Sequence, residues 1–171
     1  MVQIFRHMSN DELVGRDPLR PNFVVGIEPI RTTHQADLRI MRTKDGRQFI
    51  GKSSKSRIKQ WGEQFAMQIR RYKPDKPLEG PLWLRLVFAF PLNKGDKGKS
   101  HPHPVKPDWD NLPKTVCDIM TREGFWHDDS QIVFGQVVKC RHVSPFVGVK
   151  ICPAPWIDEA FVSSLYDSHT D

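Results

Sequence analysis

Two short acidic stretches contain the residue types and spacings best suited to chemistry. In the first, Asp108 and Asp110 are separated by one residue, and Lys114 follows Asp110 by four positions. In an extended segment, side chains two residues apart point to the same face. Two carboxylates held together repel unless a cation or a proton relieves them, and carboxylate oxygens suit Mg²⁺. This spacing indicates a candidate metal site with a lysine beside it.

The second acidic stretch is the pair Asp128–Asp129, which lies between a predicted helix and the next predicted strand. A helix and a strand that return over the same sheet would bring this pair towards Asp108. The residues alone leave simpler interpretations open. Asp110 could serve only as a helix N-cap, Lys114 could be its surface ion-pair partner, and Asp128–Asp129 could form a solvated turn.

Phosphodiester hydrolysis is the chemistry that such a site would perform. Mg²⁺ polarises a phosphate and lowers the pKa of a bound water. Lys114 would neutralise charge on the phosphate in the transition state. The segment Asn93–Pro107 is predicted to be a mobile loop, and its lysines would contact backbone phosphates. These lysines are Lys94, Lys97, Lys99 and Lys106.

The composition fits one globular domain with a polyanionic partner. The chain has 171 residues, of which 38% are hydrophobic and 27% charged, and its net charge is +6. Basic residues gather in Asn93–Pro107 and in a second run from Arg39 to Arg57. No apolar run approaches the roughly 20 residues that span a bilayer, and the N-terminus does not read as a signal peptide. We therefore expect a cytoplasmic protein that does not associate with membranes.

Hydrophobic periodicity predicts an α+β fold in which helices cover a mixed β-sheet. Apolar residues at helical spacing predict two core-facing helix sides: Ile58, Trp61, Phe65 and Ile69, and then Leu112, Val116, Ile119 and Met120. The predicted helices run from Ser53 or Ser54 to about Tyr72, from Asp110 to about Gly124, and within 155–165. The predicted strands are 24–31, 38–42, 47–50, 82–90, 131–140 and 146–152, with a hairpin turn at 44–46. The three cysteines, Cys117, Cys140 and Cys152, have no paired spacing and are expected to be buried thiols.

The two acidic stretches also carry a recognisable signature. Residues 106–114 read Lys-Pro-Asp-Trp-Asp-Asn-Leu-Pro-Lys, and residues 124–131 read Gly-Phe-Trp-His-Asp-Asp-Ser-Gln. This pattern resembles the signature of RusA-type Holliday junction resolvases, K/R-P/R-D-x-D-N-L-x-K followed by G-x-x-x-D-D-x-Q. The resemblance implies a single RusA-like domain over residues 1–171, with a lead-in, 1–23, and a tail, 154–171, outside the matched core.

The resemblance also implies an activity and its requirements. Members of this family are homodimeric endonucleases that depend on Mg²⁺, with Mn²⁺ as an alternative, and no organic cofactor is expected. They nick two strands of a four-way DNA junction symmetrically, in DNA recombination and repair. We therefore expect a bacterial or phage-encoded protein whose partners are DNA junctions and a second copy of itself.

The roles of the acidic residues and the lysine follow from the resemblance as well. Asp108, Asp110 and Asp129 are expected to bind the metal, and Lys114 is expected to be the catalytic lysine. Asp128 is expected to be a further ligand or to support the other three.

Five neighbouring residues complete the comparison with the signature. Asn111 and Asp118 match signature positions and are assigned supporting roles. His103 lies where related phage sequences often carry a histidine, so it would contact a phosphate or remain an ordinary loop residue. Trp109 replaces an aliphatic residue and is expected in the core or in the dimer interface. Pro113 replaces a polar or aliphatic residue and is tolerated in a first helical turn.

A homodimer suits a four-way junction because two symmetrical cuts need two related active sites. Phe23, Phe134 and Phe146 are candidates for the interface or for a wedge in the junction, with ordinary core packing as the alternative. Other functions fit the residues too. They are a nuclease that cuts flaps or forks, a junction-binding protein with little catalysis, and a basic packaging protein of a phage.

Overall fold

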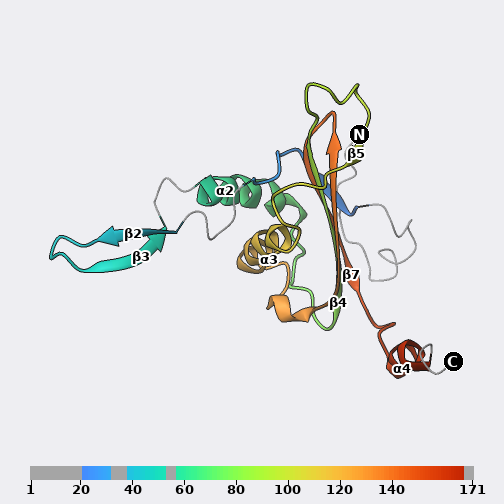
Figure 1. Ribbon diagram of the computed structural model, residues 1–171. Coiled ribbons are helices and arrows are strands. Elements are labelled where there is room, and N and C mark those ends of the chain that lie inside the picture. Colours follow the sequence, from blue (N-terminus) through green and yellow to red (C-terminus); the bar gives the residue numbers. More distant parts are fainter. Residues whose placement is uncertain (1–20, 32–37, 53–56, 168–171) are drawn as a thin grey trace.

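A five-stranded sheet forms the centre of the protein (Figure 1). In the computed structural model the described residues are 21–31, 38–52 and 57–167. The sheet contains β1 (Phe23–Val25), β4 (Leu82–Pro91), β5 (His101–Pro102), β6 (Ile132–His142) and β7 (Phe146–Pro153), in the order β1-β7-β4-β6-β5. Only the β4–β6 pair is parallel, and the other neighbouring pairs are antiparallel. The predicted mixed sheet is therefore confirmed.

Two helices, α2 (Arg57–Ile69) and α3 (Asn111–Glu123), cover one face of this sheet (Figure 1). Alternate residues of β4 face the helices, because side chains alternate between the two faces of a strand. These residues are Leu82, Leu84, Leu86 and Phe88, each at most 3% exposed. Both predicted apolar helix faces belong to the same core. Burying each such side chain contributes about 1.5–3 kcal/mol, which fixes α3 on the sheet.

Charged contacts and a glycine cap define the ends of the two helices. The 3₁₀ turn η2 (Arg70–Tyr72) extends α2, and Arg70 donates two hydrogen bonds to Glu123, at 2.8 and 3.2 Å. α3 ends at Gly124, whose backbone has φ +80° and whose N–H bonds to carbonyls of the last turn. Glycine suits this left-handed cap. The predicted C-terminal ends of both helices are confirmed.

Strands β2 (Leu38–Arg42) and β3 (Gln48–Lys52) form a separate two-stranded sheet. The strands meet at the predicted turn, where Gly46 has φ +84°. In Figure 1 this hairpin extends away from the central sheet, beyond α2. The predicted hairpin is confirmed, and it stands apart from the core.

Two predicted segments differ from the structure. The strand expected over 24–31 is limited to β1, because the chain turns where the N–H of Ile27 bonds to the carbonyl of Val25 at 2.8 Å. The loop expected over 93–107 contains β5, which pairs with Cys140 and Arg141 of β6. The helix caps proposed at Ser53 and Ser54 lie outside the described residues.

The C-terminal segment forms the predicted short helix, α4 (Glu159–Asp167). Trp156 precedes it and packs edge-on against Phe134 and Phe161, with ring centres 5.4 Å apart in both pairs. The three cysteines are free thiols, as predicted, and Cys140 is only partly buried. None of the helices in the part of the chain that the structure describes is long and apolar enough to cross a membrane.

Candidate active site

The first acidic stretch forms a turn that leads directly into α3. Asp108 is exposed, and residues 109–110 form the turn. Asp110 occupies the N-cap position with helical dihedral angles, φ −70° and ψ −31°. The extended geometry that would place Asp108 and Asp110 on one strand face is therefore wrong. The turn at 109–110 sets their relative orientation instead.

Asp110 holds the cap position without acting as a cap. Its side chain accepts no hydrogen bond from the first turn of α3. Its one side-chain bond that the structure shows comes from the adjacent amide of Asn111, at 3.4 Å. The carboxylate is exposed, so most of its acceptor capacity faces solvent. The N-cap interpretation is correct for the backbone and wrong for the side chain.

The two faces predicted for α3 are confirmed. Lys114 and Asp118 are exposed, while Leu112 and Val116 are buried. Pro113 lies in the first turn, where helical N–H groups have no partner to lose. Lys114 is therefore fixed by a packed helix while its ammonium group remains accessible.

The second acidic stretch is a tightly bonded 3₁₀ turn, η3 (Asp129–Gln131). The Asp128 carboxylate accepts the N–H of Ser130 at 2.9 Å. Hydrogen bonding from the side chain and the backbone of Ser130 lowers the pKa of Asp128. The amide oxygen of Gln131 accepts the N–H groups of His127 and Asp128, at 2.8 and 3.1 Å. Asp128 is thus committed to a capping box, while Asp129 is exposed.

Gln131 also ties η3 to the segment that leads into β4. Its side-chain nitrogen donates to the carbonyls of Leu78 and Gly80, at 3.0 and 3.1 Å. Leu78 in turn donates its N–H to the carbonyl of Phe125 at 2.8 Å. One glutamine side chain therefore fixes the position of Asp129 relative to the sheet.

The electrostatics of Cys117 connect the two acidic stretches. Burial raises the pKa of this thiol to about 12, with further upward contributions from Asp129 and Asp118. The charge of Lys114 lowers the pKa of the same thiol. These three charged groups therefore act on one point of α3. The turn η3 contacts α3, so Asp129 lies near the helix that carries Lys114.

Contacts from β6 hold the segment before Asp108 in place. Lys139 donates from Nζ to the carbonyls of Val105 and Pro107, the first at 2.8 Å. The backbone N–H of His103 bonds to the carbonyl of Lys139 at 3.1 Å. The chain leading to Asp108 is thus attached to the central sheet at three points.

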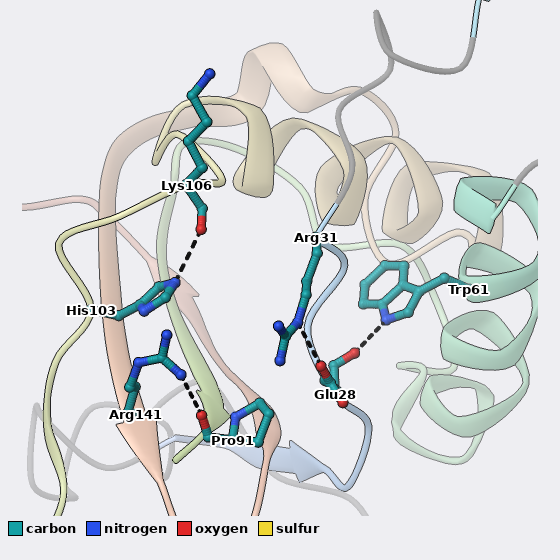
Figure 2. Close-up of polar contacts among 7 residues, drawn as sticks. All are labelled: Glu28, Arg31, Trp61, Pro91, His103, Lys106 and Arg141. Carbon is teal, nitrogen blue, oxygen red and sulfur yellow. Dashed lines mark hydrogen bonds and ion pairs between the residues drawn. The ribbon is translucent and has the colours of Figure 1, made fainter. Parts of the chain in front are cut away.

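His103 is a packed residue of this segment. Figure 2 shows its ring directed at the carbonyl of Lys106, with a 3.2 Å contact from Nε2. The centre of the ring lies 4.4 Å from that of Phe90, and the residue is 6% exposed. Burial lowers the pKa of His103, and the charges of Arg141, Lys139 and Arg31 lower it further. The ring is therefore covered by protein, and a phosphate contact of His103 stays a prediction.

Three of the four predicted DNA-binding lysines lie on the loop before β5, and Lys106 follows it. Lys94, Lys97 and Lys99 are exposed there, and Lys106 is exposed beside the acidic stretch. The carboxylate of Asp96 organises this loop by accepting the N–H of Asn93 at 2.6 Å. It also forms an ion pair with Nε2 of His101, at 3.0 Å.

The aromatic candidates have separate positions. Trp109 is 64% exposed, so its predicted place in the core is wrong and the interface alternative stays a prediction. Phe23 is buried and stacks on Tyr72 with ring centres 4.5 Å apart. Phe146 packs edge-on against His142 at 5.5 Å. Phe23 thus follows the core-packing alternative.

Gln131, Lys139 and Arg141 organise the site without having been assigned a role from the sequence. Lys139 and Arg141 are cross-strand partners of Phe88 and Phe90, whose side chains face the core. Arg141 is 9% exposed, and its guanidinium donates to the carbonyl of Pro91 at 2.6 Å (Figure 2). A charged residue at a core-facing position of a strand is the signal that could have identified both.

The chemistry of the donor set determines whether these residues fit a metal ion. Within residues 21–31, 38–52 and 57–167, no three His, Cys, Asp or Glu side chains form a group that could hold one. Mg²⁺ retains several waters and is commonly held by only one or two protein carboxylates. Asp108 and Asp110 are exposed and close in sequence, so they fit that smaller donor set.

Comparison with known proteins bears on the same region. The family model of the endodeoxyribonuclease RusA matches residues 29–152. No match was found among curated proteins. The matched region is well over half of the 171 residues and includes both acidic stretches and the loop lysines. The chain therefore belongs to the RusA family of endodeoxyribonucleases.

Proposed function

We propose that this nuclease is Mg²⁺-dependent and resolves Holliday junctions by paired symmetrical nicks, in DNA recombination and repair. Mn²⁺ is the alternative metal. One observation carries the proposal: in a RusA-family chain, exposed Asp108 and Asp110 stand at the start of α3, which also presents Lys114.

Each side chain of the site has a task in this proposal. Asp108, Asp110 and Asp129 hold the metal, which when bound polarises the phosphate and activates a water. Lys114 neutralises the charge that develops on the phosphate. Asp128 supports Asp129 through the capping box of η3. Asn111 and Asp118 keep supporting roles on α3.

The loop lysines bind the DNA backbone in this proposal. Lys94, Lys97, Lys99 and Lys106 are exposed and contact phosphates on either side of the cut. His103 is assigned here to the DNA-binding loop as the residue that positions Lys106, through its contact with the Lys106 carbonyl.

The protein is proposed to act as a homodimer, in a bacterial or phage-infected cell. One chain carries one signature, and a four-way junction presents two related strands. Two-fold symmetry would place one acidic site on each strand. Exposed Trp109 is a candidate for the interface.

A junction-binding protein with little catalysis is the second candidate. The observation that favours it is the separation of the carboxylates, since no three of them form a metal-binding group among the described residues. The presence of all four signature residues, Asp108, Asp110, Asp129 and Lys114, favours the nuclease.

Cleavage of a synthetic mobile four-way junction, with and without Mg²⁺, tests the proposal, beside a linear duplex of the same sequence. Metal-dependent, symmetrical nicks in the junction alone are expected. Tight binding without cutting would support the binding protein. Equal cutting of flaps or forks would broaden the substrate class, and no binding or cutting would contradict both candidates.

A further inference from the structure

The hairpin Leu38–Lys52, named here the basic hairpin, is a strongly charged part of the molecule. It contains five basic residues and one acidic residue, so its net charge is +4. The basic residues are Arg39, Arg42, Lys44, Arg47 and Lys52. Arg42, Lys44 and Arg47 are exposed around its tip. This charge is separate from the loop lysines that precede β5.

The tip of the basic hairpin has a defined geometry. The N–H of Thr43 bonds to the carbonyl of Arg47 at 2.9 Å, and the N–H of Gly46 bonds to the carbonyl of Thr43 at 3.0 Å. The Thr43 hydroxyl adds contacts to Arg47 at 3.2 and 3.1 Å. A three-residue loop that ends in a left-handed glycine is a common hairpin connection. The turn therefore presents Lys44 and Arg47 from a hydrogen-bonded frame.

The charge at the tip remains available for a partner. The one ion pair shown there joins Nε of Arg47 to Asp45 at 3.4 Å, with side chains 86% and 61% exposed. Exposed pairs of this kind contribute at most about 1 kcal/mol and are easily exchanged. A phosphate can therefore replace Asp45 as the partner of Arg47.

The basic hairpin shares no sheet with the rest of the described chain. Isolated two-stranded hairpins are only marginally stable in water. Ile40 is 72% exposed on one of its faces, so the described part of the chain leaves this face open to solvent. A second copy of the chain would bring the same positive charge to this surface. A polyanion is the complementary partner.

The described segments on either side of the basic hairpin belong to the part of the protein that carries the candidate active site, and residues 32–37 and 53–56 between them and the hairpin are outside the described residues. Arg31, the last described residue before it, acts electrostatically on His103, which contacts the carbonyl of Lys106. After the hairpin, α2 begins at Arg57 and packs with α3 in one core. Figure 1 shows the hairpin projecting beyond α2, away from the central sheet. Its five-residue strands span about 17 Å, and a two-stranded ribbon fits the major groove, which is about 12 Å wide.

We propose that the basic hairpin is a second DNA-binding element, which binds backbone phosphates of the duplex beside the cut. This inference rests on the proposed function. It assigns to Arg42, Lys44 and Arg47 a role in holding a duplex arm, distinct from the chemistry at Asp108 and Asp110.

The double variant Lys44→Gln/Arg47→Gln tests the inference, because it removes charge and keeps the turn residues Asp45 and Gly46. The matched control is Arg71→Gln/Lys76→Gln, which removes two exposed charges outside the hairpin and the site. Junction binding without Mg²⁺ is measured over a range of salt concentrations. The hairpin variant should bind on the order of tenfold more weakly, with a log–log salt slope reduced by about 1.8.

Footprinting and cleavage complete the test. The hairpin variant should lose protection of the flanking duplex, keep protection at the cut, and nick at the wild-type rate when saturated. Affinity, salt slope and footprint equal to those of the control would overturn the inference while leaving the nuclease intact. A change from dimer to monomer in sedimentation would identify the hairpin as a contact between chains and also overturn it. A wild-type protein that neither binds nor cuts junctions would refute the proposed function itself.

Discussion

Asp110 occupies the N-cap position of α3, but its side chain does not cap the helix. A helix N-cap usually accepts an N–H of the first turn, whereas this carboxylate accepts none and is exposed. A residue that does not stabilise its helix in this way is available to bind a ligand. Its replacement should therefore affect chemistry more than folding.

Asp110→Asn should abolish cleavage while junction binding and thermal stability remain near wild type. The substitution keeps the shape and removes the charge that the metal needs, so the rate should fall by more than about 10²-fold. Single-turnover cleavage and gel-shift binding measure the two properties, with Glu79→Gln as an exposed control. Loss of binding together with cleavage would contradict the assigned role.

Lys139 is a positioning residue, because it holds the two carbonyls that precede Asp108. Lys139→Met keeps the length of the side chain and removes these hydrogen bonds. The turnover number should fall by about tenfold or more, since small misplacements of reacting groups are costly. The Michaelis constant for the junction should change less. An unchanged turnover number, or equal losses in Lys76→Met, would show that Lys139 does not position the site.

At the scale of elements, the sequence predicts best where hydrophobic spacing determines the structure. The buried faces of α2 and α3 and the apolar strand β4 follow directly from periodicity. The turn at Asp108–Asp110 does not, because an exposed segment has no core to impose a period. β5 was also missed, since its two residues pair with β6 through backbone contacts that leave no pattern in the side chains.

In the candidate site, too, some residues could be predicted from the sequence, whereas their hydrogen-bond partners could not. Asp108, Asp110 and Lys114 were predicted as site residues from their types and spacing. The clamp by Gln131 depends on carbonyls of Leu78 and Gly80, far away in the sequence. Such partners are known only when the chain is folded.

The loop before β5 should respond to pH through its Asp96–His101 ion pair. The pairing with Asp96 raises the pKa of His101, while burial and the charge of Arg141 oppose it. The hydrogen bond from Asn93 and the pairing with His101 lower the pKa of Asp96. A raised histidine pKa means that the stabilisation is complete below about 6.5 and is lost as the pH rises through the folded value. Asp96 stays ionised throughout that range.

Amide hydrogen exchange over residues 93–100 should therefore speed up from pH 6 to 8.5, beyond the intrinsic effect of pH. His101→Asn should remove this extra dependence and leave the loop in its high-pH state. Equal pH dependence in the two proteins would show that the ion pair does not organise the loop.

At the scale of the whole molecule, the positive charge of the chain should dominate its affinity for DNA. The net charge is +6, and the exposed lysines before β5 stand on the same chain segment as the acidic stretch. Phosphate contacts release condensed counterions, so the logarithm of the binding constant falls linearly with that of the salt concentration. The slope therefore measures how many phosphates the protein neutralises, independently of catalysis.

The triple variant Lys94→Gln/Lys97→Gln/Lys99→Gln should reduce the magnitude of this slope by up to about 2.7, at roughly 0.9 for each phosphate that is no longer neutralised. Because none of the three touches Asp108, Asp110 or Lys114 in the proposed site, cleavage of saturated junction at low salt should persist. Filter binding across a salt series gives the slope, and cleavage at low salt gives the rate. A slope equal to that of wild type would remove the loop from the DNA-binding surface. Cleavage that fails even at saturation would mean that these lysines act in the reaction itself.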